Sequence, residues 1–141
     1  MVEIQVRYEG ELHCSAAHVP SQSTLATDAP VDNHGKGAHF SPTDLMATAL
    51  GTCMLTTMGI VARRHGEDLT GMRVQVTKHM TKSPPRRIDT LAVTFRTPTA
   101  VASSLSVEAK RRLEEAAHGC PVRLSLLPAI AVPVSFDWSA H

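Results

Sequence analysis

The sequence predicts an α+β fold in a single domain spanning residues 1–141. Strand-like and helical stretches come in blocks: three strands, a long helix, two strands, two helices and one strand. Strict alternation of strands and helices would instead predict a doubly wound parallel sheet. A chain of 141 residues, 43% hydrophobic and 19% charged, is long and apolar enough to bury its own core.

Three strands are expected in the first 28 residues. Apolar and polar residues alternate over residues 2–8, with Val2, Ile4, Val6 and Tyr8 on one face. A tight turn at residues 9–11 would lead into residues 11–18 as the second arm of a hairpin. Residues 22–28 would add a third strand, and the Gly, Pro and Asn content of residues 29–40 predicts a loop.

A long helix is expected from Ser41 to about residue 64. Ser41 suits the N-cap, Pro42 suits the first helical position, and Asp44 stands where an acid completes a capping box. Apolar residues cover most of its circumference, so we expect burial on nearly all sides, which needs help from a second subunit. Interrupting threonines and glycines make the run too polar for a membrane span, and we predict none.

The second half of the chain alternates between strand and helix signals. Residues 72–80 and 88–96 predict two strands joined by a proline-rich connection. Residues 106–118 predict an amphipathic helix that ends at Gly119, followed by a short helix from Cys120 to about residue 127. The last strand is expected over residues 130–136, where apolar residues alternate again.

Charge and motif content exclude several functions. The net charge is +1 and no basic stripe with interleaved aromatics occurs, which argues against nucleic-acid binding. Three cysteines without a short spacing do not form a secreted disulfide framework, and no signal-peptide core is visible, so we expect a cytoplasmic protein. Eight histidines show none of the usual metal-ligand spacings, so we predict no metal site and no bound cofactor.

Two cysteines are the main candidates for chemistry. Cys53 lies in the middle of the long helix, two residues after Gly51, where some neighbour has to approach closely. Cys120 begins a helix, where unpaired backbone N–H groups favour a thiolate. Either one alone could be an inert buried thiol. Together they indicate a dithiol that folding brings into contact, whereas Cys14 has no companion motif and is interpreted as structural.

Further residues could activate or orient Cys53. A cysteine in apolar surroundings needs a positive partner to become reactive. The candidates are Arg7, His13, His39, Arg86 and Arg87, and the sequence alone does not choose among them. Asp44 could orient a base or a cation near Cys53, although a capping role is the simpler and stronger interpretation.

The motifs around both cysteines resemble those of the OsmC/Ohr family, the osmotically induced and organic hydroperoxide resistance proteins. Residues 41–53 begin with Ser-Pro-Thr-Asp-Leu and end with Ala-Leu-Gly-Thr-Cys, which is similar to the first cysteine motif of the family. The Cys-Pro-Val segment at residues 120–122 is similar to the second. The two cysteines stand 67 residues apart (120 − 53), a similar spacing, and the expected order of elements fits throughout.

This resemblance implies a fold and a chemistry. It implies an intertwined homodimer in which two long central helices are wrapped by antiparallel sheets from both chains. It also implies a peroxiredoxin-like reduction of organic hydroperoxides in oxidative stress defence, with Cys53 as the peroxidatic and Cys120 as the resolving residue. A sulfenic acid on Cys53 would condense with Cys120 to a disulfide, which an external dithiol of the lipoyl type reduces.

Two positions depart from the pattern of the peroxidase members, which pair an arginine from the first hairpin turn with a glutamate after the motif proline. The turn at residues 9–11 contains no arginine, and Thr43 follows Pro42, with Asp44 one step later. The pattern is more similar to a less characterised OsmC-like branch. An alternative hypothesis is therefore a non-catalytic dimer that binds a small apolar or electrophilic molecule at the subunit interface, which the methionines of the long helix would also suit.

Overall fold

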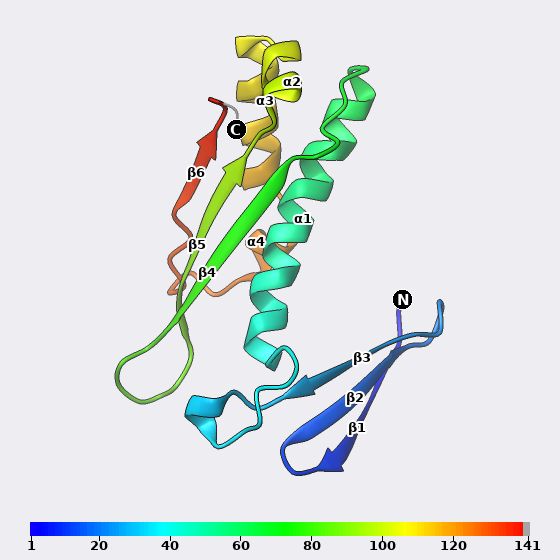
Figure 1. Ribbon diagram of the computed structural model, residues 1–141, viewed down its shortest axis with the longest axis vertical. Helices are drawn as coiled ribbons and strands as arrows, with labels where there is room; N and C mark the ends of the chain where they lie inside the picture. The colour runs from blue at the N-terminus through cyan, green and yellow to red at the C-terminus, as the bar shows by residue number, and fades with distance from the viewer. Residues whose placement is uncertain (140–141) are drawn as a thin grey trace. The chain divides into compact units, whose positions relative to one another are not determined.

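The computed structural model describes residues 1–139, which form two three-stranded sheets and several helices (Figure 1). The predicted α+β class is confirmed. By its contacts the chain divides into two compact units, Met1–Met46 and the remainder from Ala47 onward. The single domain that the sequence predicts stays a prediction. Helix α1, Pro42–Arg64, begins in the first unit and continues into the second.

The N-terminal unit is an antiparallel meander with the strand order β1-β2-β3. Its strands are β1 (Ile4–Gly10), β2 (His13–His18) and β3 (Ser23–Asp28), close to the three that the sequence predicts. Gly10, Glu11 and Leu12 all have positive φ angles, so the expected turn between β1 and β2 is confirmed one residue further along. The loop after β3 contains one 3-10 helix, Val31–Asn33.

The apolar face of β1 is exposed to solvent within the described chain. Ile4, Val6 and Tyr8 are 54%, 67% and 63% exposed. Alternation of this kind normally places the apolar face of a strand in a core. This face is therefore suited to contact with another chain.

The C-terminal unit holds the second sheet, with the order β4-β5-β6. Its strands are β4 (Arg73–Met80), β5 (Ile88–Arg96) and β6 (Val134–Asp137). Strands β4 and β5 form the expected antiparallel hairpin, but β6 pairs with β5 in parallel. The expectation of purely antiparallel sheets is wrong here, because the helical connection between β5 and β6 is long enough for a parallel crossover.

Three helices make this connection: α2 (Thr99–Ser104), α3 (Val107–His118) and α4 (Pro121–Ser125). Helices α3 and α4 match the two that the sequence predicts, whereas α2 was not predicted because six residues carry too little periodicity. Strand β6 begins at Val134, later than expected, since Pro133 has no N–H group to donate to a ladder.

One face of α1 supplies the centre of the core. Leu50, Met54 and Met58 are fully buried. They belong to the same core cluster as Leu91, Val93 and Phe95 of β5, which are at most 1% exposed. The far side of α1 is open, with Ala49, Thr52 and Thr56 exposed, and Ile60 is 49% exposed. One chain alone leaves part of α1 open, so the predicted burial on nearly all sides with a second subunit stays a prediction.

Helix α1 is long and apolar enough to cross a membrane, with a mean hydropathy of 1.7 in its most apolar window. The core helix of a soluble protein has the same length and composition. Because Leu50, Met54 and Met58 pack into the core of the chain's own C-terminal unit, we interpret α1 as such a core helix.

Gly51 lies where β4 packs against α1. A methyl group added at this position would lie 2.9 Å from a methyl carbon of Val76 and 3.3 Å from one of Val74. The neighbour that the sequence required to approach Gly51 closely is therefore strand β4.

We expect the Gly51→Ala substitution to destabilise the protein. Overpacking against two stiff valines costs about 1–3 kcal/mol, which exceeds the gain of roughly 1 kcal/mol from alanine's helix propensity. Thermal or urea unfolding measures the net loss. In a Val76→Ala background the same substitution should cost less, and an equal cost in both backgrounds would contradict this packing explanation.

Candidate active site

Helix α1 positions Cys53 beside the core of the C-terminal unit. Cys53 is partly buried and packs against the core cluster, and Met54, its neighbour in sequence, is fully buried. Its place on the helix is at the border between the buried face and the open face. The thiol is therefore held by packing while part of the residue stays exposed to solvent.

The junction of α3 and α4 positions Cys120. Helix α3 ends at Gly119, whose N–H group donates to the carbonyl of Glu115, and Pro121 begins α4. Cys120 is the N-cap of α4: its sulfur accepts a hydrogen bond from the backbone N–H of Arg123 at 3.3 Å. The residue is fully buried, so this short turn fixes the sulfur inside the unit.

The two thiols meet across the core. The Cys53 thiol lies near enough to the Cys120 thiol to raise its pKa. The two residues that the sequence singled out, 67 positions apart (120 − 53), are thus in contact within one unit.

The charge state of Cys120 differs from the expectation. Burial is the main cause that raises the pKa of the Cys120 thiol; the nearby Cys53 thiol raises it further, while the backbone N–H of Arg123 lowers it. Desolvation disfavours the charged form of a thiol. The expected thiolate at this helix start is therefore wrong, because burial outweighs the N–H donor, and Cys120 keeps its proton at neutral pH.

The contact is asymmetric in a chemically useful way. Cys53 is partly exposed and can meet a molecule from solvent, whereas Cys120 is sealed and protonated. A buried thiol beside an accessible one can donate its proton to the neighbouring sulfur. It can also attack that sulfur once an oxidant has reacted with it.

Asp44 caps α1, which confirms the simpler of its two interpretations. Its Oδ2 accepts a hydrogen bond from the backbone N–H of Ser41 at 2.8 Å, and the Ser41 Oγ accepts one from the backbone N–H of Asp44 at 3.1 Å. These reciprocal bonds form the capping box that the sequence predicts. Any orienting effect of Asp44 on Cys53 stays a prediction.

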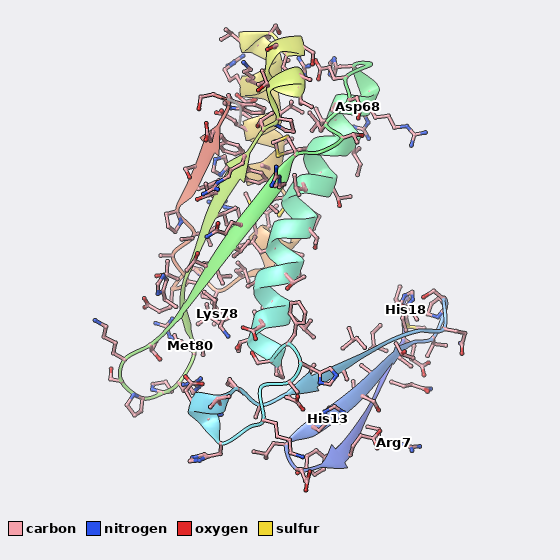
Figure 2. The ribbon with its side chains drawn as sticks, in the orientation of Figure 1. Arg7, His13, His18, Asp68, Lys78 and Met80 are labelled. Carbon is pink, nitrogen blue, oxygen red and sulfur yellow. The ribbon has the colours of Figure 1, made fainter. Side chains whose placement is uncertain are left out.

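Arg7 and His39 both lie in the N-terminal unit. Arg7 lies on β1 (Figure 2), opposite Ser15 in the β1–β2 ladder. It lines a hollow of about 410 Å³ on this sheet. The Nδ1 atom of His39 is 3.1 Å from Oδ2 of Asp28. Their proposed action on Cys53 also stays a prediction.

One group of polar residues was missed by the sequence analysis. His13, Asp28 and His39 come together in the N-terminal unit, although 15 residues separate the first two and 11 the last two (28 − 13 and 39 − 28). No short motif marks them. The one available signal was their position in the two predicted strands. His13 lies near the start of the strand at residues 11–18 and Asp28 at the end of the strand at residues 22–28, so an antiparallel pair brings them together.

Comparisons with known proteins place this geometry in a family. The family model described as OsmC-like protein matches residues 34–135, which include both cysteines. The chain belongs to the OsmC-like protein family. The search of curated proteins found no match.

Solved structures of OsmC-like proteins share the fold over nearly the whole chain. A Psychrobacter arcticus protein, provisionally titled osmotic stress induced and detoxification response protein, is 39% identical, with a TM-score of 0.89 and coverage of 97% of this chain and 96% of its own. An organic hydroperoxide resistance protein OsmC from Legionella pneumophila is 15% identical, with a TM-score of 0.75 and coverage of 97% and 96%.

A third structure comes from Vibrio cholerae and is provisionally titled an organic hydroperoxide resistance protein, with captopril bound in one of its active sites. It is 20% identical, with a TM-score of 0.74 and coverage of 96% of this chain and 90% of its own. At these lower identities, the Legionella and Vibrio likenesses show the fold alone. The OsmC-like fold that the resemblance implied is therefore confirmed.

Proposed function

We propose that this OsmC-like protein is a thiol peroxidase that reduces organic hydroperoxides through Cys53 and Cys120. The observation that carries the proposal is the contact between a partly exposed thiol and a fully buried, protonated one. Two structural relatives carry the words organic hydroperoxide resistance in their names, which supports the same substrate class.

The proposed cycle has two chemical steps on the protein. The Cys53 thiol gives up its proton, and its thiolate attacks the terminal oxygen of the peroxide ROOH. The O–O bond breaks, Cys53 becomes a sulfenic acid, and the alkoxide takes up the released proton and leaves as ROH. The Cys120 thiol then attacks the Cys53 sulfur, an S–S bond forms, and the hydroxyl leaves with the thiol proton as water. The protein loses two electrons and the peroxide gains two.

An external dithiol closes the cycle. It attacks the disulfide, leaves as a cyclic disulfide and returns both protein thiols to the reduced form. A reducing cytoplasm supplies such dithiols and keeps the resting protein reduced, so we propose that compartment. As candidates for the group that activates Cys53 we propose Arg7 and His39, with Asp44 as a candidate for orienting it.

The same proposal includes a homodimer. The apolar face of β1 and the outer face of α1 are both exposed in one chain, although each has the character of a buried surface. Exposed apolar patches of this kind mark protein–protein contacts. A second copy whose long helix lies against the open side of α1 would cover residues next to Cys53 and narrow the entrance to the thiols.

Sedimentation equilibrium tests the dimer. We expect a mass of twice the 15.2 kDa of one chain, and a shift toward the monomer for Ile60→Glu, because a carboxylate would be buried in the contact. Val107→Glu is the matched control: it changes another exposed apolar residue at the first turn of α3, where an acid is favourable. A monomeric wild type, or equal behaviour of both variants, would refute the interface.

Steady-state kinetics test the activity. Purified protein should consume cumene hydroperoxide catalytically when dihydrolipoamide is present, and one equivalent per site when no reductant is added. Monothiols should support slower turnover, since reduction then needs two separate exchange steps. Consumption no faster than in buffer with the same dithiol would rule out the peroxidase.

A non-catalytic binding protein is the second candidate, and the first hairpin turn favours it. Glu11 in this turn pairs with Lys36, and no arginine is present at the place where the peroxidase members carry one. In this case the dithiol would persist after exposure to hydroperoxide, and a small apolar or electrophilic molecule would stay bound. The kinetic experiment separates the two candidates.

A further inference from the structure

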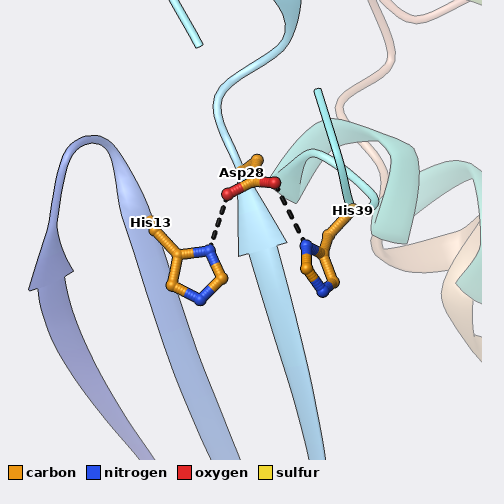
Figure 3. Close-up of side chains that lie close together, drawn as sticks. All are labelled: His13, Asp28 and His39. Atoms are coloured by element: carbon orange, nitrogen blue, oxygen red, sulfur yellow. Dashed lines mark hydrogen bonds and ion pairs between the residues drawn. The ribbon is translucent and has the colours of Figure 1, made fainter. Parts of the chain in front are cut away.

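Three polar side chains of the N-terminal unit converge outside the dithiol site. The carboxylate of Asp28 lies between two imidazoles: its Oδ1 is 2.6 Å from Nδ1 of His13, and its Oδ2 is 3.1 Å from Nδ1 of His39 (Figure 3). One donor atom from each residue lies within 4.8 Å of the others. We infer that His13, Asp28 and His39 form a binding site for a divalent transition metal ion, with Zn²⁺ as the best-matched ion.

Backbone hydrogen bonds hold the three residues in place independently of their side chains. His13 and Asp28 are direct partners in the β2–β3 ladder. The N–H of Asp28 donates to the carbonyl of Phe40 at 3.2 Å, which brings His39 to the end of β3. The site is therefore built on strands and an anchored segment, the kind of rigid support that a metal centre needs.

The charges of the cluster favour a cation. The Asp28 side chain is only 4% exposed. The carboxylate is an anionic ligand, and each of its oxygens has an imidazole nitrogen beside it. A buried negative charge is costly. A divalent ion would compensate it.

The donor set matches zinc. Two imidazole nitrogens and one carboxylate oxygen are three protein ligands of the kind found in open zinc sites, with water as the fourth. Bonds of about 2.0–2.2 Å bring tetrahedral ligand atoms to roughly 3.3 Å from one another. The imidazoles would have to move inward, which their exposure of 32% and 48% permits. Each neutral ring would then carry its proton on Nε2.

A purely structural role does not require these side chains. The backbone bonds at Asp28 and Phe40 already anchor the loop to the sheet, and either histidine could be replaced without breaking them. The site also shares no residue with the dithiol. The inference therefore goes beyond the proposed peroxidase, and its failure would leave the peroxidase proposal unchanged. The two proposals share only His39, which is a metal ligand in one and a candidate for activating Cys53 in the other.

Metal titration of the reduced full-length protein tests the inference. Co²⁺, as a spectroscopic substitute for Zn²⁺, should bind with one equivalent per chain and give visible d–d bands without the near-ultraviolet charge-transfer band of a thiolate ligand. Zn²⁺ should displace it. His39→Gln and Asp28→Asn should each weaken binding at least about tenfold.

His18→Gln is the matched control, because His18 lies at the other end of β2 and contacts Ser21. This variant should bind metal as the wild type does. His39 is about half exposed, so His39→Gln should remain folded and decides the test even if Asp28→Asn does not fold. Absence of saturable binding, a thiolate charge-transfer band, or wild-type affinity in His39→Gln would overturn the inference.

Discussion

Replacing Cys53 by serine should reduce hydroperoxide consumption to the uncatalysed rate. A serine hydroxyl does not ionise near neutral pH and does not form the sulfenic acid on which the cycle depends. Because the residue is only partly buried and differs by one atom, the fold should tolerate the change. The initial rate of cumene hydroperoxide loss, measured with dihydrolipoamide in excess, reports the effect.

Cys14→Ser provides the control for this experiment. Cys14 lies on β2 opposite Tyr8 and Thr27, in the other compact unit, and takes no part in the proposed cycle. It should consume hydroperoxide at the wild-type rate. Undiminished consumption by Cys53→Ser would remove Cys53 from the mechanism, whatever the control does.

Replacing Cys120 by serine should limit the protein to a single oxidation. Cys53 would still attack the peroxide, but the sulfenic acid would have no neighbouring thiol with which to condense. We expect a burst of one equivalent of alcohol per site and then a rate limited by slow external thiols. Trapping with dimedone followed by mass analysis of the intact protein should find the adduct on Cys53.

The buried position of Cys120 calls for a stability control. Serine places a more polar group in a fully buried site but can still accept the hydrogen bond from the Arg123 N–H. Cys120→Ala adds no polar group, but it loses this cap and leaves a small void. Both variants should show the same burst and the same trapped Cys53. Sustained turnover with dithiol at the wild-type rate in either variant would contradict the resolving role.

The strongest sequence signals predicted the framework of the fold. The Ser41–Asp44 capping box, the alternation in β1 and the stop after Arg64 depend on neighbouring residues, and the structure shows each close to its expected place. The contact between Cys53 and Cys120 was predicted from motif pairing. In the structure, α1 and the α3–α4 junction bring the two thiols together in one core.

Other features depend on distances that a sequence does not contain. The pKa of Cys120 is set by how deeply the thiol is buried, which its position at a helix start does not reveal. The parallel pairing of β6 follows from the path of the chain through α2–α4. The His13–Asp28–His39 cluster arises because a strand pairing and a loop anchor meet at one point.

The exposed apolar residues mark a limit of a different kind. The periodicity of β1 and α1 predicts that both have buried faces, yet Tyr8 and Ile60 are 63% and 49% exposed in one chain. In the proposed dimer these faces would be covered, because burial in an oligomer selects the same residues as burial in a core.

The formation of the disulfide tests the central claim most directly. Reduced protein is treated anaerobically with one equivalent of cumene hydroperoxide, and the intact mass and the peptide map are then recorded. We expect a rapid loss of two hydrogens and a single cross-link between the peptides that contain Cys53 and Cys120. A dithiol that persists under these conditions, or a cross-link through Cys14, would contradict the proposed chemistry.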